Sequence, residues 1–183
     1  MTVKGYFPFS LLFSLSLLLF FSGATPVNLV YETCKKSSQE DPNVSYSFCV
    51  ASLLAVPKSK HASLRGLGFI SMNLTKSNAT NIHLYIKKLL KHKKFDPFEK
   101  NCLSDCLDLY SDAIDLMDDA INSFKSKHYF DANIQVSAAL DVPSTCEDGF
   151  KEKKIRVSPL TKINGNMFQL SALDLSIIEM VRR

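Results

Sequence analysis

A row of six aspartates is the first group of side chains that could carry chemistry. Carboxylates that converge on one point bind metal ions or act as general acids and bases. Helical periodicity instead spreads this row along an outer face, and the inward-pointing Glu and His pairs of a di-metal bundle have no counterpart in the chain. We interpret the row as a solvated face, with a docking face for a basic partner as the alternative; its members are Asp105, Asp108, Asp112, Asp115, Asp118 and Asp119.

The four histidines are the second group, and they lie far apart without the spacing of metal ligands. The sequence around the histidines does not indicate a catalytic Ser, His and Asp triad or a Cys and His pair. The chain also lacks a Gly-rich phosphate loop. The sequence therefore predicts no catalysis, no metal ion and no cofactor. Three roles are left: binding another protein, carrying a small ligand, or serving as a structural unit. The histidines are His61, His83, His92 and His128.

Residues 1–24 have the parts of a secretory signal peptide: a basic Lys4, an apolar run over 11–21, and small residues ending at Ala24. The alternative is a membrane anchor, but the apolar run is too short to span a bilayer comfortably. Cleavage after Ala24 removes Lys4 and lowers the formal charge from +4 to +3. That charge is too small to indicate a nucleic-acid partner. We expect a secreted, extracellular protein.

Export places the five cysteines in an oxidising compartment, where they form a disulfide framework with one thiol left over. Two short helical patterns on either side of Asp41-Pro42-Asn43 predict a hairpin over residues 25–56. A Cys34–Cys49 bridge is the economical way to clip it, and composition does not assign the other pair. Apolar surface left on the hairpin needs cover from the rest of the chain or from a second molecule, so a monomer and a hairpin-mediated dimer are both open.

Three glycosylation sequons also agree with export, and any glycan they carry must face solvent. The acceptor residues are Asn43, Asn73 and Asn78.

Four long amphipathic patterns follow the hairpin and fill residues 57–183. They extend over about 61–92, 102–125, 129–150 and 158–183, with Ser158 as the expected N-cap and Pro159 as the first residue of the last helix. Residues 75–81 are polar on every side, so we expect a kink or a local irregularity there. Short links between long helices predict an all-α, antiparallel up-and-down four-helix bundle. The buried stripe expected of the acidic helix is Cys102, Cys106, Leu109, Ala113, Leu116, Ala120 and Phe124.

A cluster of lysines closes the first of these helices, where the macrodipole favours cations. The alternative is a patch that binds an acidic polymer such as pectin. The cluster consists of Lys87, Lys88, Lys91, Lys93 and Lys94.

Several segments together resemble the plant invertase and pectin methylesterase inhibitor family, and the resemblance extends over the whole mature chain. They are residues 105–110, 137–140 and 158–161, and the run Thr145-Cys146-Glu147-Asp148-Gly149-Phe150. Within the family, residues 124–127 and 150–154 are similar to the pollen-allergen type of invertase inhibitor. The resemblance implies a hairpin followed by a four-helix bundle, and disulfides Cys34–Cys49 and Cys106–Cys146. It leaves Cys102 as a buried thiol outside both bridges, although its place one turn before Cys106 would let it compete for Cys146.

The resemblance implies that the chain is not an enzyme but inhibits a carbohydrate enzyme in a one-to-one complex. Invertase inhibitors of this family carry Pro-Lys-Phe in the link between the second and third bundle helices. This chain has Ser126 followed by the candidate contact residues Lys127, His128, Tyr129 and Phe130. For Tyr129 the alternative is packing at the start of a helix. We expect a secreted inhibitor of a cell-wall or vacuolar invertase. The first alternative is a pectin methylesterase inhibitor, which would bind through the polar outer faces of the second and third bundle helices. The alternative of a different class is a lipid or small-ligand carrier.

Overall fold

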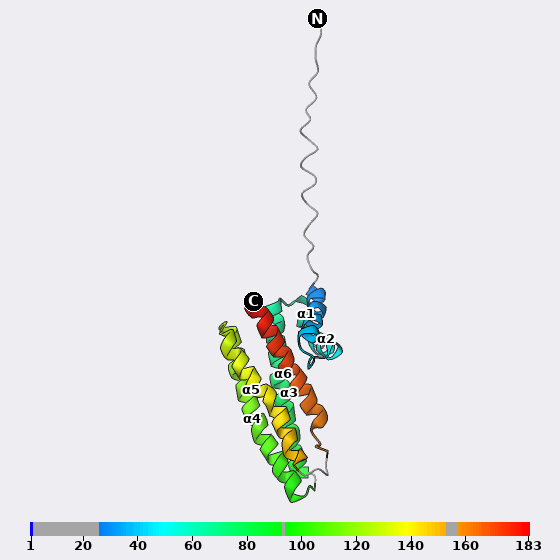
Figure 1. The fold of residues 1–183 in the computed structure, drawn as a ribbon, viewed down its shortest axis with the longest axis vertical. Helices are drawn as coiled ribbons and strands as arrows, with labels where there is room; N and C mark the ends of the chain where they lie inside the picture. Colours follow the sequence, from blue (N-terminus) through cyan, green and yellow to red (C-terminus); the bar gives the residue numbers. More distant parts are fainter. Residues whose placement is uncertain (2–25, 93, 153–156) are drawn as a thin grey trace.

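The computed structural model describes residues 1, 26–92, 94–152 and 157–183. Within these residues the chain is entirely helical, and four long helices alternate in direction to form a bundle (Figure 1). The predicted all-α bundle with an N-terminal helical hairpin is therefore confirmed. The hairpin is α1 (Pro26–Glu40) and α2 (Tyr46–Leu54), a 3-10 turn, η1 (Pro57–His61), follows, and the bundle helices are α3 (Leu64–His92), α4 (Pro97–Lys125), α5 (Tyr129–Lys151) and α6 (Thr161–Arg182).

The hairpin packs against one end of α3 and α6 (Figure 1). The Cys34–Cys49 disulfide joins its two helices. Their buried side chains, including Val30 and Leu53, share a core cluster with Leu67 of α3 and with residues of α6. The apolar face of the hairpin is therefore covered by the bundle of the same chain, which was one of the two expected covers, the other being a second molecule.

The start of α3 differs from the prediction by three residues. Pro57–His61 forms the separate 3-10 turn, and α3 begins at Leu64 after Ser63, whose Oγ accepts a hydrogen bond from the Gly66 N–H at 3.2 Å. Residues 75–81 show no interruption of the helix, because α3 continues through them as α-helix. Polar side chains in this stretch have partners on the neighbouring helices: Thr75 bonds to α6, and Lys76 pairs with α4.

The predicted start of the last helix was also wrong. Helix α6 begins at Thr161, and Ser158 Oγ accepts a hydrogen bond from the Leu160 N–H at 3.0 Å within a preceding turn. The hydroxyl of Thr161 donates to Glu147 of α5 at 2.9 Å, so a tertiary contact accompanies the start of the helix. A sequence pattern that looks only for a local cap misses such a contact.

The predicted buried stripe of α4 is confirmed at five of its seven positions: Cys102, Cys106, Ala113, Ala120 and Phe124 are buried. The other two, Leu109 and Leu116, are only half-buried, and the neighbouring Tyr110 and Met117 are buried instead, together with Leu103. Tyr110 is fully buried because its hydroxyl donates to Asn164 Oδ1 of α6 at 2.6 Å. Burial raises the pKa of this phenol far above its usual range.

The predicted signal peptide, residues 1–24, lies outside the described part of the chain except for Met1. Among the described helices, none combines the length and the apolar composition needed to cross a membrane.

Candidate functional site

The link between α4 and α5 has a fixed backbone. Helix α4 ends in a Schellman motif, in which the His128 N–H donates to the Ser123 carbonyl at 2.9 Å and the Lys127 N–H donates to the Phe124 carbonyl at 3.1 Å. Lys127 has φ 63°, and it is the single non-glycine residue with positive φ in the described chain. Glycine is usual at this position, because a Cβ costs about 1–2 kcal/mol in the left-handed region. A strained lysine at an exposed tip is a candidate for function.

The four candidate contact residues do not share one environment. Lys127 and His128 are exposed, and the Phe130 side chain is 68% exposed. Tyr129 is half-buried, and its ring packs edge-on against Phe124, with 5.3 Å between the ring centroids. The geometry at Tyr129 is that of helix-start packing, whereas the other three side chains are available to a partner.

A small pocket of about 120 Å³ lies beside the link, between the start of α5 and the end of α6. Phe130, Asn133 and Arg182 are among its lining residues. Sequence reasoning did not include Asn133 or Arg182, because only the antiparallel packing of α5 and α6 brings them next to Phe130.

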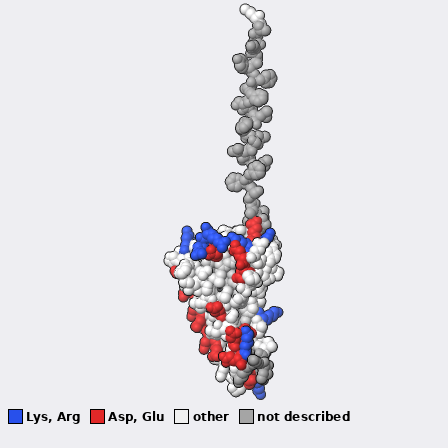
Figure 2. All heavy atoms as spheres, viewed as in Figure 1, with Lys and Arg blue, Asp and Glu red and all other residues white. Residues whose placement is uncertain are grey.

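Positive charge gathers at this end of the bundle, where α6 terminates (Figure 2). We call this surface the basic end; its exposed members are Lys125, Lys127, Arg182 and Arg183. Both arginines pair with Glu179, at 2.8 and 3.2 Å. The hydrogen bond from Arg183, followed by the charge of Arg182, lowers the pKa of Glu179.

The opposite half of the bundle contains the second disulfide, Cys106–Cys146, which joins α4 to α5 as the family resemblance implied. Cys102 is a buried thiol outside both disulfides, and its Sγ donates to the Gly149 carbonyl at 3.4 Å. An open groove of about 290 Å³ borders these three cysteines.

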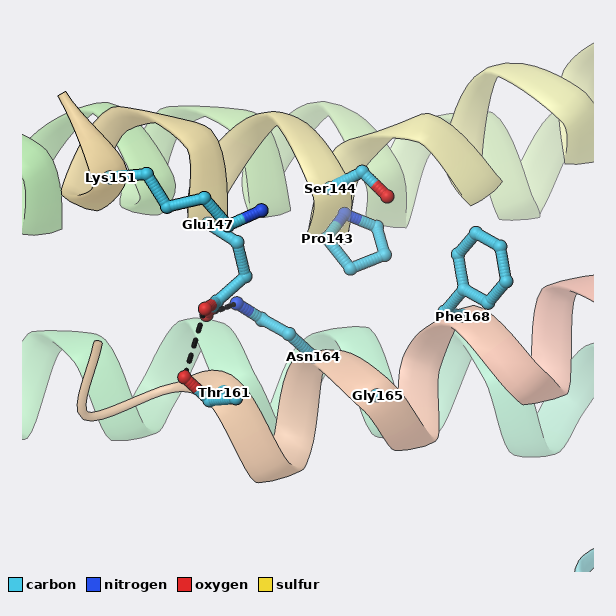
Figure 3. Close-up of a pocket in the computed structure, with 8 residues that line it drawn as sticks. All are labelled: Pro143, Ser144, Glu147, Lys151, Thr161, Asn164, Gly165 and Phe168. Atoms are coloured by element: carbon cyan, nitrogen blue, oxygen red, sulfur yellow. Dashed lines mark hydrogen bonds between the residues drawn. The ribbon is translucent and has the colours of Figure 1, made fainter. Parts of the chain in front are cut away.

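A polar network next to this disulfide joins α4, α5 and α6, and sequence reasoning missed it. Asn164 accepts from Tyr110, and its amide donates to Glu147 Oε1 at 2.6 Å; Thr161 donates to the other oxygen of the same carboxylate. Figure 3 shows the two bonds to Glu147, from Asn164 and Thr161, across the groove between α5 and α6. The groove holds about 380 Å³ and is bordered by Pro143 and Phe168. Because Glu147 accepts two hydrogen bonds from the neighbouring helix, its role here is structural. The one hint of this network in the sequence is Asn164, a polar residue among the apolar residues of α6, and helical periodicity does not predict its partners.

The acidic row follows one flank of the bundle (Figure 2). Five of its members are exposed, and Asp118 pairs with Lys76 of α3. In the described residues no group of three or more potential ligands lies close enough to hold a metal ion. The histidines are not brought together either, since they occupy η1, the middle and end of α3, and the α4–α5 link.

The lysine cluster lies at the end of α3, where Lys87, Lys88, Lys91 and Lys94 are exposed; Lys93 is outside the described residues.

The three sequons have different settings. Asn43 is exposed in the turn between α1 and α2, while Asn73 and Asn78 lie within α3. The Nδ2 of Asn73 donates to the Phe69 carbonyl, and Asn78 is half-buried. Asn43 therefore has the accessible turn position that suits a glycan.

Comparison with known proteins identifies the family. The model of the plant invertase/pectin methylesterase inhibitor family matches residues 28–177. The chain belongs to this family. Its members are inhibitors of enzymes and not enzymes themselves.

Individual members of the family are similar over nearly the full length. A "putative invertase inhibitor" of Platanus acerifolia is 49% identical over 170 residues, which cover 93% of this chain and 94% of that protein. Pectinesterase inhibitor 12 of Arabidopsis thaliana is 39% identical over 165 residues, 89% of this chain and 94% of that protein. A crystal structure of a mutant pectin methylesterase inhibitor from Arabidopsis superimposes with a TM-score of 0.66 at 27% identity, over 80% of this chain and 93% of that one. The comparisons thus show the inhibitor fold. The names of the relatives include inhibitors of both invertase and pectinesterase.

Proposed function

We propose that this inhibitor is secreted and blocks the active-site cleft of a plant acid invertase in a one-to-one complex. The observation that supports the proposal best is the α4–α5 link, which presents Lys127, His128 and Phe130 to solvent on a rigid backbone. A cation and an aromatic ring side by side suit a cleft that is acidic and binds sugar rings. The similarity to the Platanus protein named "putative invertase inhibitor" supports this choice of target.

Rigidity explains how so small a surface can compete with substrate. An interface that is ordered before binding loses less side-chain and loop entropy when the complex forms. The Schellman motif and the packing of Tyr129 on Phe124 order the link in the uncomplexed inhibitor. The cost of ordering it is therefore met during folding.

Pectin methylesterase is the second candidate target. The link has no Pro-Lys-Phe, and α4 exposes a long acidic face that a basic partner would match. The similarity to pectinesterase inhibitor 12 agrees with this alternative. In that complex the outer faces of α4 and α5, not the link, make the contact.

The carrier hypothesis draws no support from the core. Buried Ala132 and Ala139 of α5 share a cluster with Met72, Met117 and Phe124, whose side chains fill the space that the alanines leave. The bundle also covers the apolar face of its own hairpin, so we propose that the inhibitor acts as a monomer.

The test is a titration of the oxidised chain, without residues 1–24, against acid invertase and pectin methylesterase in parallel. Replacing Lys127 by alanine should weaken inhibition of invertase by about tenfold, as expected for a central contact. Lys100→Ala is the matched control, because it removes the same charge from the exposed surface at the opposite end of α4. Unchanged activity of both enzymes at a large molar excess would refute the inhibitor proposal, and inhibition of pectin methylesterase alone would favour the second target.

A further inference from the structure

Arg65 connects the start of α3 to the end of α4. Its Nη2 donates to the Lys125 carbonyl at 2.8 Å and lies 3.5 Å from the Phe124 carbonyl. The last carbonyls of a helix lack partners within the helix and carry partial negative charge. The half-buried guanidinium therefore caps α4 from a neighbouring helix, 60 residues away in the sequence.

An aromatic cluster holds the same region from the inside. The Phe124 ring is fully buried between Phe69 of α3, at a centroid distance of 5.0 Å, and Tyr129 of α5, at 5.3 Å. The guanidinium carbon of Arg65 lies 5.3 Å from the centre of the Phe69 ring. Arg65 thus touches both the backbone and the ring stack that support the link.

Gly68 leaves the space that this arrangement needs. A Cβ at Gly68 would lie 2.6 Å from Cζ of Phe124 and 3.3 Å from Cγ2 of Ile177. Arg65, Gly68 and Phe69 belong to one turn of α3, so a single turn of that helix contacts the end of α4 through polar, steric and aromatic contacts at once.

These contacts reach the exposed residues through one shared atom. The Phe124 carbonyl accepts from the Lys127 N–H of the Schellman motif and also faces Arg65. We propose that Arg65 is a positioning residue for target binding: its contact with the Lys125 and Phe124 carbonyls presets the link that carries Lys127, His128 and Phe130. This role rests on the proposed function, and Arg65 itself does not touch the target.

The first measurement uses the inhibitor alone, so its outcome is independent of the target. In Arg65→Met the amides of Lys127 and His128 should exchange hydrogen about tenfold faster, because the Phe124 carbonyl that accepts from Lys127 loses its guanidinium contact and the His128 amide belongs to the same Schellman motif. Amides near the Cys106–Cys146 disulfide should be unaffected. Arg183→Met is the matched control, since it removes a positive charge from the same end without touching the link. Unchanged exchange at Lys127 and His128 would overturn the proposal whichever enzyme is inhibited.

The second measurement is the inhibition constant against acid invertase. Arg65→Met should weaken it about tenfold through the entropy of a mobile link, and Lys100→Met, at the opposite end of α4, should leave it within about twofold. Arg65→Lys should restore part of the loss, because an ammonium group reaches one carbonyl but cannot stack on Phe69 as a planar guanidinium does. This conservative variant also keeps the test decisive if Arg65→Met does not fold.

The two proposals fail in different ways. If exchange accelerates and inhibition is unchanged in Arg65→Met, while Lys127→Ala weakens inhibition, the link is the contact surface but its ordering by Arg65 is irrelevant, and the positioning role is refuted. If neither variant alters inhibition, the link is not the contact surface, and the positioning role is refuted although the chain still acts as an inhibitor. If the parent protein inhibits neither enzyme, the proposed function itself fails.

Discussion

Replacing Asp174 by asparagine should remove most of the pH dependence of stability between about pH 4 and pH 7. Asp174 is fully buried on α6, facing α3. The Thr75 hydroxyl oxygen lies 2.6 Å from Asp174 Oδ2 and 3.1 Å from the Ser71 carbonyl oxygen. A hydroxyl has one proton, and a carbonyl only accepts, so both bonds form at once only if the carboxyl is protonated and donates to Thr75.

The magnitude follows from the pKa of this carboxyl. Burial raises the pKa of Asp174 from 3.8 to about 7, against the opposing effect of its hydroxyl neighbours. The folded protein therefore binds a proton that the unfolded chain releases within this window, and stability falls as pH rises through it. At about 1.4 kcal/mol per pKa unit, the loss is about 4 kcal/mol between pH 4 and pH 7, with no further loss above. An amide at this position can donate to Thr75 at every pH, so the variant avoids the loss.

The assay is denaturant unfolding of the oxidised protein at several pH values from 4 to 8. The difference in unfolding free energy between Asp174→Asn and the parent should grow with pH by about 4 kcal/mol. Asp115→Asn, which changes an exposed aspartate of α4 in the same way, is the control and should follow the parent. Parallel pH profiles for the parent and Asp174→Asn would refute the argument that the folded state holds a neutral carboxyl.

Three further outcomes are expected. Lys127→Gly should leave stability unchanged or raise it by up to about 1 kcal/mol, because glycine relieves the positive φ, yet it should weaken invertase inhibition; a large loss of stability would contradict the strain argument. In thermal unfolding, Gly68→Ala should destabilise by about 1–3 kcal/mol through its clash with Phe124, whereas Gly165→Ala, with open space around its Cβ, should stabilise by about 0.5–1 kcal/mol; equal effects would be contrary to the packing described. Replacing both Cys106 and Cys146 by serine should cost about 4 kcal/mol in denaturant unfolding, as a closed loop of about 40 residues predicts, and a cost below about 1 kcal/mol would show that this bridge adds little.

Local patterns in the sequence were sufficient for the number and order of the long helices, although not for the starts of α3 and α6. The apolar spacing of α4 and α5 and the turn residues between α1 and α2 depend on neighbours within four positions. The α4–α5 link was therefore placed within a residue of its observed position.

The sequence could not show which polar residues are buried. Asn164 and Asp174 look like surface residues of α6, and each is buried because a hydroxyl on another helix contacts it. Arg65 is similar: its role depends on carbonyls 60 residues away. Such partners depend on the register between helices, which apolar periodicity does not specify. Two positions of α4 illustrate this, because Tyr110 and Met117 are buried in place of the predicted Leu109 and Leu116.

The backbone at the end of α4 opposes a Pro-Lys-Phe sequence in this link. Proline requires φ near −65°, so Lys127 at 63° excludes it. At Ser126, with φ −83°, the N–H donates to the Asn122 carbonyl four residues earlier. A proline there would remove that bond, bring its ring against the same carbonyl, and disfavour the helical backbone of Lys125, the residue before it. A proline before Lys127 would therefore require the end of α4 to rearrange, so the present end of α4 and a Pro-Lys-Phe sequence at these positions exclude each other.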